Sequence, residues 1–331
     1  MSNLPRITII TPSFNQGKYI EQTILSVLEQ DYPNLEYIIM DGGSSDETVE
    51  IIRKYESQIA YWESKPDNGQ SDAINKGLQR ATGDVFNWLN SDDILEKGAL
   101  QEVGKAFAEK DILSFNGVCR TFKDGNLAET VNTTYTTFSK RPEQTIAKVS
   151  MGQPSQFYSL KAIRELGNCV NTSLSHSMDK ELWCRFLFRF GTDKVMFTNS
   201  TLSSFRLHGE SKTVNLHEVF RKDDYALYLS IFNQFNAPDF LKSFVLKFEL
   251  NKNYKNVWNE GLINPQLLFA YFAVRFATEY YTLREYDNCR KCLLYARKNG
   301  YPFDSNFLSL FGKIMLLPTP LINFARKIKN S

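Results

Sequence analysis

The sequence predicts an α/β protein with a doubly wound, mostly parallel, Rossmann-like sheet, followed by an α-helical C-terminal domain. Over residues 6–89, short β-branched runs alternate with amphipathic helical patterns, an order typical of parallel sheets. After about residue 215, long aromatic-rich helical patterns replace this alternation. We therefore expect one domain over residues 1–215 and a second over residues 216–331.

The individual elements follow from periodicity. Residues 6–11 form a β-branched run that Pro12 ends, which predicts a buried strand. A helix is expected over residues 18–30, because Ile20, Ile24 and Val27 share one face. The same reasoning predicts strands at 35–40, 59–63 and 85–89, and helices at 47–55 and 71–81.

A second group of elements follows the alternating region. Asp124-Gly125 is a turn signal between two strand-like runs, and it predicts a hairpin of residues 112–122 and 127–135. Further strands are expected at 153–158, 194–198 and 202–207, and a helix at 179–190. The C-terminal helices are expected at 219–235, 239–247, 266–282 and 285–298.

Composition limits the class of protein. The 331 residues are 42% hydrophobic and 23% charged, as in soluble globular proteins. With 39 basic against 37 acidic residues, the net charge of +2 offers no general attraction for nucleic acid. Five scattered cysteines fit a reducing compartment, and neither a secretory signal nor a long apolar span is visible. We expect a cytoplasmic protein.

The sequence leaves two kinds of binding partner undecided, a membrane surface and a second copy of the chain. A basic tail at residues 324–329 follows an apolar segment and is a candidate for peripheral contact with the inner face of an anionic membrane. Homo-oligomer formation is equally open. Cys289 and Cys292 lie three residues apart on an expected helix, where buried packing accounts for them better than a metal.

Polar residues follow three of the predicted parallel strands. They are Ser13 to Asn15 after the first strand, Asp41 after the second and Asn90 to Asp93 after the fourth. Because ligands of such sheets bind beyond the carboxyl ends of the strands, these loops are expected to converge. The adjacent carboxylates Asp92 and Asp93 repel each other, which a divalent cation such as Mg²⁺ or Mn²⁺ would relieve. The alternative is a solvated turn in which Asp93 caps the next helix.

Four motifs lie at or near the ends of the predicted parallel strands: TPSFNQG at 11–17, DGGSSDET at 41–48, NGQSDAINKG at 68–77 and WLNSDD at 88–93. Together they resemble the family-2 inverting glycosyltransferases of the GT-A fold. The motifs stand in the order and spacing of that family, and the resemblance covers residues 6–213. No glycine-rich dinucleotide fingerprint or phosphate-binding P-loop competes with this interpretation.

The resemblance implies a nucleotide-binding set made of Thr11, Pro12, Ser13, Phe14, Asp41, Gln70, Ser71 and Asp92. In that set Phe14 would lie against the base, Asp41 would accept a hydrogen bond from it, and Asp92 would lie nearer the ribose. Asp93 would bind the metal that holds the diphosphate. Ile74 stands where many members have arginine, so help with the diphosphate must come from elsewhere, for example Gln70, Ser71 or Lys76.

The acceptor side is implied by the segment SMDKELW at 177–183, which places the catalytic base on Asp179. Capping of the following helix is the alternative role for Asp179. The segment FRLHGESKT at 205–213 makes His208 a candidate metal ligand and Lys212 a candidate diphosphate contact. Their alternatives are a structural histidine and a solvated loop lysine.

Together these features predict an inverting glycosyltransferase that uses Mn²⁺ or Mg²⁺. It would move a hexosyl or N-acetylhexosaminyl group from a nucleotide-diphosphate sugar, expected to be a UDP-sugar, to a hydroxyl of a glycan or lipid-linked acceptor in surface polysaccharide synthesis. One alternative is a non-catalytic carbohydrate-binding or scaffold protein on the same fold. A second alternative is a sugar-phosphate nucleotidyltransferase, although residues 11–17 lack the basic glycine-rich opening of those enzymes.

Overall fold

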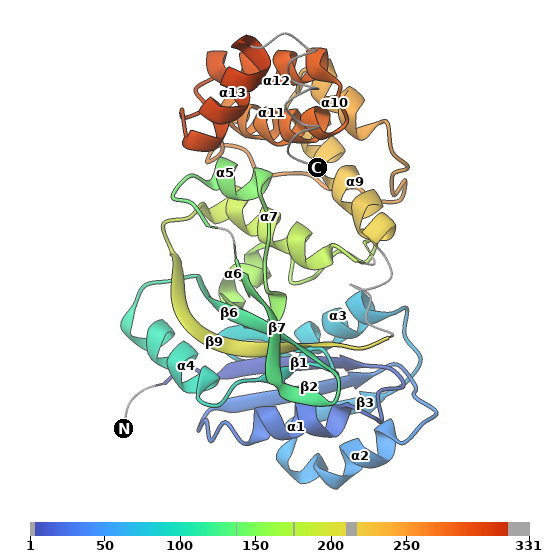
Figure 1. Cartoon of the computed structure of the whole chain (residues 1–331). Coiled ribbons are helices and arrows are strands. Elements are labelled where there is room, and N and C mark those ends of the chain that lie inside the picture. Colours follow the sequence, from blue (N-terminus) through green and yellow to red (C-terminus); the bar gives the residue numbers. More distant parts are fainter. Residues whose placement is uncertain (1–3, 137, 175, 210–216, 317–331) are drawn as a thin grey trace. The chain divides into compact units, whose positions relative to one another are not determined.

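The computed structural model describes residues 4–136, 138–174, 176–209 and 217–316 (Figure 1). Its contacts divide the chain into two compact units. The first contains the described residues of Met1–Thr137 and Ser150–Asp224, and the second those of Phe138–Val149 and Tyr225–Ser331. The domain boundary expected near residue 215 lies outside the described residues.

The first unit is built on a mixed sheet in the order β3-β2-β1-β4-β8-β6-β9-β5, with β7 paired to β6 (Figure 1). Its parallel part consists of β1 (Ile7–Ser13), β2 (Leu35–Asp41), β3 (Tyr61–Ser64) and β4 (Val85–Trp88). The chain adds β2 and β3 on one side of β1 and then crosses to place β4 on the other. This reversal of direction at β1 is the point where open α/β sheets bind ligands.

Helices cover both faces of the parallel part (Figure 1). The helices α1 (Ile20–Leu28), α2 (Thr48–Lys54) and α4 (Ala99–Glu109) share a core with Ile7 and Ile9 of β1. On the opposite face, α3 (Gln70–Arg80) packs on β1 and β2. This packing depends on Gly77, because a Cβ there would lie 2.6 Å from Cγ2 of Ile10. The expected alternation of strands and helices is confirmed.

The other half of the sheet contains β5 (Ile94–Leu95), β6 (Ser114–Lys123), β7 (Asn126–Tyr135), β8 (Gln156–Ser159) and β9 (Val195–Leu207). Here β8 is antiparallel to both β4 and β6, whereas β9 is parallel to β6. The predicted hairpin is present as β6 and β7. The two closing strands predicted at 194–198 and 202–207 are one strand, since register shifts between β6 and β9 absorb the residues between them.

Shorter elements complete this unit. A 3₁₀ turn at Glu56–Gln58 precedes β3, another at Gln153–Ser155 precedes β8, and α6 (Leu160–Glu165) follows it. The helix α7 (Met178–Phe190) buries Trp183 and Phe186, whose rings stack with centroids 5.3 Å apart. Helices α4 and α6 were not among the sequence predictions.

The second unit is helical and aromatic-rich. It contains α5 (Pro142–Ala147), most of α9 (His217–Gln234), α10 (Asp239–Val245), α11 (Pro265–Thr282), α12 (Tyr286–Lys298) and α13 (Ser305–Leu316). Phe244 of α10 stacks on Phe276 of α11 at 4.2 Å, and Phe232 of α9 meets Phe272 edge to face at 4.9 Å. Cys289 and Cys292 are buried free thiols of α12. The expected C-terminal helical region is therefore confirmed.

Among the described helices, none combines the length and the hydropathy that a membrane crossing requires. The basic tail at 324–329 and its expected membrane contact lie outside the described residues.

Candidate active site

The carboxyl ends of β1 and β2 bring Ser13 beside Asp41 in the parallel register. The buried carboxylate of Asp41 accepts hydrogen bonds from the backbone N of Gly43 at 3.1 Å and of Ser44 at 2.9 Å. It also accepts from the hydroxyls of Ser44 and Ser64, and the 2.6 Å bond from Ser64 joins β2 to β3. A carboxylate offers about four acceptor positions. Asp41 therefore shapes the loop after β2, and its bond to a base stays a prediction.

Phe14 directly follows β1, and its ring is 59% exposed. The loop that carries it is fixed, because Asn15 N donates to Ser44 Oγ at 2.7 Å and Ser45 N donates to Asn15 Oδ1 at 2.9 Å. The buried hydroxyl of Ser13 has no hydrogen-bond partner among the described residues. An exposed ring on a fixed backbone suits stacking on a flat base. The Phe14 ring is thus accessible for the predicted role, whereas the Ser13 hydroxyl is buried and its contact with a nucleotide stays a prediction.

Thr11 and Pro12 lie inside β1 and are buried. The hydroxyl of Thr11 is 3.1 Å from that of Tyr37, so the Thr11 side chain is engaged within the sheet. The predicted nucleotide contact of Thr11 therefore lacks an accessible side-chain group.

Asp93 is fully buried in the loop after β4. Its two carboxylate oxygens accept from the backbone N of Arg206 and from Nδ2 of Asn90, each at 3.1 Å. Its carbonyl oxygen accepts from the hydroxyl of Thr23 at 2.8 Å. Burial raises the pKa of Asp93 well above its ordinary value, and the neighbouring charge of Asp92 adds to the shift. The metal-binding role of Asp93 stays a prediction, and both its carboxylate oxygens accept hydrogen bonds within the fold.

Asp92 has the opposite environment. Its carboxylate is partly exposed, and Oδ2 lies 2.9 Å from Nε2 of His208. The His208 ring rests against Tyr19, with ring centroids 4.7 Å apart. A carboxylate oxygen and an imidazole nitrogen that lie this close together are a pair of ligand atoms suited to Mn²⁺. Asp92, which lies beside His208, is therefore a second candidate metal ligand.

Arg206 of β9 holds this loop in place and is itself almost fully buried. Its Nε donates to the carbonyl oxygen of Asp92 at 2.9 Å, and Nη1 donates to Asp124 at 3.2 Å. Nη2 donates to Gln22 of α1 at 2.5 Å, and the guanidinium lies 5.0 Å from the centre of the Tyr19 ring. One side chain therefore ties the loop after β4 to α1 and to the β6–β7 turn.

The N-terminus of α3 reaches the same loop. Nε2 of Gln70 donates to Oδ1 of Asn90 at 2.6 Å, so Gln70 and Asp93 are joined through Asn90. Gly69 caps the helix with φ of 96°, a conformation that favours glycine. Ser71 Oγ is 3.5 Å from the carbonyl oxygen of Leu174, a contact toward the chain that precedes α7.

Ile74 and Lys76 differ in accessibility. Ile74 is fully buried, so it belongs to the packing of α3. The Lys76 ammonium is partly exposed and pairs with Asp72 at 3.1 Å, one helical turn away. Lys76 thus has a partner within its own helix.

Asp179 lies in the first turn of α7, where its Oδ1 accepts from the backbone N of Lys180 at 2.7 Å. The Lys180 ammonium pairs with Asp224 of α9, which also accepts from Ser177 Oγ at 2.8 Å. Burial raises the pKa of Asp179, while the hydrogen bond and charge of Lys180 oppose the shift. A raised pKa strengthens a carboxylate as a base. The role of Asp179 as the catalytic base is consistent with this environment and stays a prediction.

The structure thus joins one group of predicted residues directly. Hydrogen bonds connect Gln70, Asp93, Asp92 and His208 through Asn90 and Arg206, and a second pair consists of Ser13 and Asp41. Asp179 lies outside these groups, on α7. In the described residues, no set of three His, Cys, Asp or Glu side chains is placed to hold a metal ion. Lys212 falls outside the described residues.

Sequence reasoning assigned no role to Arg206, Tyr19 or Ser64. Arg206 was visible within the segment 205–213, but its neighbours gave no sign that a charged side chain would be buried. Tyr19 lies within the helix predicted at 18–30, and the helical pattern there gives no sign of its contacts. Their contacts come from strands that only the tertiary fold brings together.

Comparison with known proteins identifies the first part of the chain. Residues 8–166 match the family model described as "Glycosyl transferase family 2". The match contains the loops after β1, β2 and β4 and the N-terminus of α3.

Curated proteins similar to this chain are named as glycosyltransferases. A glycosyltransferase of Mycobacterium tuberculosis without further characterisation is 40% identical over 28% of this chain, and TuaG of Bacillus subtilis, named for teichuronic acid biosynthesis, is 37% identical over 37%. These two matches span 36% and 50% of the relatives' own lengths. The "GalNAc(5)-diNAcBac-PP-undecaprenol beta-1,3-glucosyltransferase" of Campylobacter jejuni is 27% identical over 68% of each chain.

A solved structure shares the fold over nearly the whole length. S. aureus TarS 1–349, crystallised with UDP-GlcNAc, superposes with a TM-score of 0.60 over 97% of this chain and 87% of TarS. Sequence identity is 17%, so this likeness shows the fold alone. The expectation of a GT-A fold with a helical C-terminal region is confirmed.

Proposed function

Because residues 8–166 match the model of glycosyl transferase family 2, we propose that this chain is an inverting glycosyltransferase. Its donor would be a nucleotide-diphosphate sugar, with UDP as the favoured nucleotide. Its acceptor would be a hydroxyl of a glycan or lipid-linked glycan of the cell surface. The observation that carries the proposal is the contact of Asp92 with His208 at the carboxyl end of β4, beside the switch point of the sheet.

The donor's base and diphosphate match different parts of this edge. The exposed Phe14 ring supplies a stacking surface for the base, beside the buried polar side chains of Ser13 and Asp41. Asp92 and His208 lie next along the sheet, at the end of β4. This order matches that of a nucleoside followed by its phosphates.

Asp92 and His208 fit a divalent cation, because a carboxylate oxygen and an imidazole nitrogen are Mn²⁺ ligands and a cation would separate the two groups. Two protein ligands suit a metal that takes its remaining ligands from diphosphate oxygens and water. When bound, the cation would neutralise charge that develops on the diphosphate leaving group. Arg206 would keep the loop in the geometry that this requires.

The chain's own contribution to the reaction is a proton transfer. In an inverting reaction the acceptor oxygen attacks the anomeric carbon while the bond to the diphosphate breaks on the opposite side. The acceptor hydroxyl must then lose its proton, and we assign this proton to the carboxylate of Asp179. A positioned general base contributes about 10²–10⁴ in rate.

Relatives support the choice of donor and acceptor. TarS was crystallised with UDP-GlcNAc, and the name of the Campylobacter relative describes glucosyl transfer to an undecaprenol-linked glycan. The free thiols of the described chain fit a reducing, cytoplasmic setting. We therefore propose a cytoplasmic enzyme that meets a lipid-linked acceptor at the inner face of a membrane.

The test is a panel of nucleotide sugars with Mn²⁺, Mg²⁺ or EDTA. Donor binding is read by thermal shift, since a ligand that binds only the folded protein raises its melting temperature. Release of the nucleoside diphosphate is then measured with lipid-linked oligosaccharide acceptors. We expect stabilisation by a UDP-sugar that EDTA removes. Binding of no nucleotide sugar, or binding equal with and without the metal, would contradict the donor or the metal assignment respectively.

A further inference from the structure

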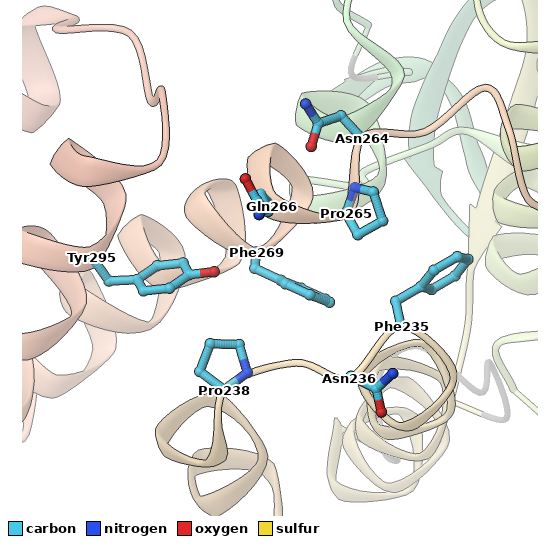
Figure 2. Close-up of a pocket in the computed structure, with 8 residues that line it drawn as sticks. All are labelled: Phe235, Asn236, Pro238, Asn264, Pro265, Gln266, Phe269 and Tyr295. Atoms are coloured by element: carbon cyan, nitrogen blue, oxygen red, sulfur yellow. The ribbon is translucent and has the colours of Figure 1, made fainter.

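The helical unit contains a pocket of about 440 Å³, which is within the range of small-ligand sites (Figure 2). All its lining residues belong to this unit: Phe235, Asn236, Pro238, Asn264, Pro265, Gln266, Phe269 and Tyr295. They come from the turn that follows α9, the starts of α10 and α11, and the C-terminal half of α12. Neither the family match nor the predicted catalytic groups include this region.

Aromatic and proline rings form the body of the pocket. Phe269 is 3% exposed and its ring lies at the centre of the lining group, between Pro238 and Phe235 (Figure 2). The hydroxyl of Tyr295 points toward Phe269 (Figure 2). Tyr295 is itself held by an edge-to-face contact with Phe240 at 5.3 Å. The pocket therefore presents rigid ring surfaces rather than flexible aliphatic chains.

Amide groups supply the polar part. Gln266 and Asn236 are exposed, and their side-chain amides have no hydrogen-bond partner among the described residues. Asn264 is different, because its Oδ1 already caps α11 by accepting from Leu267 N at 3.2 Å. The polar groups left for a ligand are thus neutral amides and one phenol.

None of the lining residues carries a charge. A phosphate, a carboxylate or a cation would lose water in this pocket without gaining an opposite charge. A sugar ring has the required chemistry, because its C–H faces pack on the negative face of aromatic rings and its hydroxyls pair with amides. We propose that this pocket binds a neutral sugar residue of the acceptor glycan. Its identification as acceptor rests on the proposed function, whereas the binding of sugar does not.

The test uses the full chain on an array of neutral, uronic-acid-containing and phosphate-containing bacterial oligosaccharides, followed by calorimetry with the best neutral glycan. The pocket variants are Gln266→Ala, which removes an exposed side-chain amide, and Tyr295→Phe, which removes only the hydroxyl. Leu294→Ala is the matched control, because Leu294 is exposed on α12 beside Tyr295 but does not line the pocket. All three changes leave the buried ring Phe269 in place.

We expect binding to neutral glycans, weakened three- to tenfold by each pocket variant, the loss typical of one neutral hydrogen bond. The control should bind like the wild type, and all melting temperatures should stay close to it. Binding confined to acidic glycans, binding to none, or equal binding by all four proteins would overturn the proposal.

UDP titration of the same variants separates this proposal from the proposed function. Pocket variants should leave UDP affinity unchanged, because the family match ends at residue 166 and includes none of the residues that line the pocket. If neutral glycans bind in the pocket and no nucleotide sugar binds anywhere, the glycan site stands and the enzymatic proposal fails. If UDP-sugars bind and the pocket variants do not change glycan binding, the enzymatic proposal stands and the glycan-site proposal fails.

Discussion

Nε2 of His208 lies 2.9 Å from Oδ2 of Asp92, although 116 residues separate them in the chain. The contact forms because the end of β9 runs beside the loop that follows β4, where Arg206 fixes both. It places an imidazole and a carboxylate together at the carboxyl edge of the sheet. This pair, rather than the adjacent carboxylates Asp92 and Asp93, is the basis of the proposed metal site.

Substitutions of Asp92 and Asp93 should have different effects. Asp92→Asn removes a charged ligand, so we expect UDP affinity in the presence of Mn²⁺ to fall by about 10- to 100-fold with little change in melting temperature. Asp93→Asn removes a buried charge that burial and Asp92 disfavour, so the melting temperature should hold or rise, and the metal-dependent affinity should fall less than in Asp92→Asn. Calorimetry with UDP and Mn²⁺, and thermal unfolding, measure both. The reverse pattern would return the metal to Asp93.

Arg206→Lys should weaken the proposed metal site, although it replaces neither of the candidate metal ligands. Lysine keeps the charge but cannot reproduce the separate bonds of the guanidinium to Asp92, Asp124 and Gln22. We expect about 1–3 kcal/mol lower stability and roughly tenfold weaker Mn²⁺-dependent binding of UDP. Arg120→Lys is the control, since Arg120 pairs with Glu96 on the same sheet. Equal UDP affinity in both variants would show that Arg206 is only structural.

Asp179→Asn should separate binding from chemistry. The amide cannot take a proton, so transfer should fall at least 10²-fold while UDP affinity stays the same. Because burial raises the pKa of Asp179, the rate should rise with pH along a limb centred above the ordinary carboxyl value of about 3.9. Asp179→Glu should keep part of the activity. If the residual activity of Asp179→Asn keeps the same pH limb as the wild type, the base lies elsewhere.

Phe14→Ala tests the stacking surface. Loss of an exposed ring that packs on a base should cost about 1–3 kcal/mol of UDP binding, whereas Phe14→Tyr should be nearly neutral. Stability should change little, because the ring is exposed. Calorimetry with UDP and with inorganic diphosphate checks the assignment. An equal loss for diphosphate would show that the ring acts on loop structure instead.

Glu36 links acid sensitivity to the sheet. Although burial opposes the shift, hydrogen bonds from Thr8 and Thr82 lower the pKa of Glu36 in the folded state. Its contribution is therefore present above the unfolded pKa, about 4.3, and is lost as pH falls through the folded value. Glu36→Gln should cost about 1–2 kcal/mol at pH 7.

Urea unfolding at several pH values measures this effect. The difference between wild type and Glu36→Gln should shrink as the solution is acidified below pH 4.3. Glu109→Gln, at an exposed end of α4, is the control and should match the wild type throughout. A difference independent of pH would mean that packing, not ionisation, explains the loss.

Local pattern was sufficient for the elements that have a single strong periodicity. Strand β1 and helix α3 appear within two residues of the predicted bounds, because β-branched runs and amphipathic spacing act over a few neighbours. The joining of two predicted closing strands into β9 was not predictable in this way. It depends on register shifts against β6, which begins about 80 residues earlier.

The sequence by itself determined the α/β alternation, the loops at the strand ends and the motifs that resemble a glycosyltransferase family. Only the tertiary structure decided which of two adjacent aspartates is buried, since Asp93 meets Arg206 from 113 residues away while Asp92 meets His208. Neighbouring residues in a turn have the same composition and the same local pattern. Their burial is set by the strand that arrives beside them, and that contact is absent from any local segment of the chain.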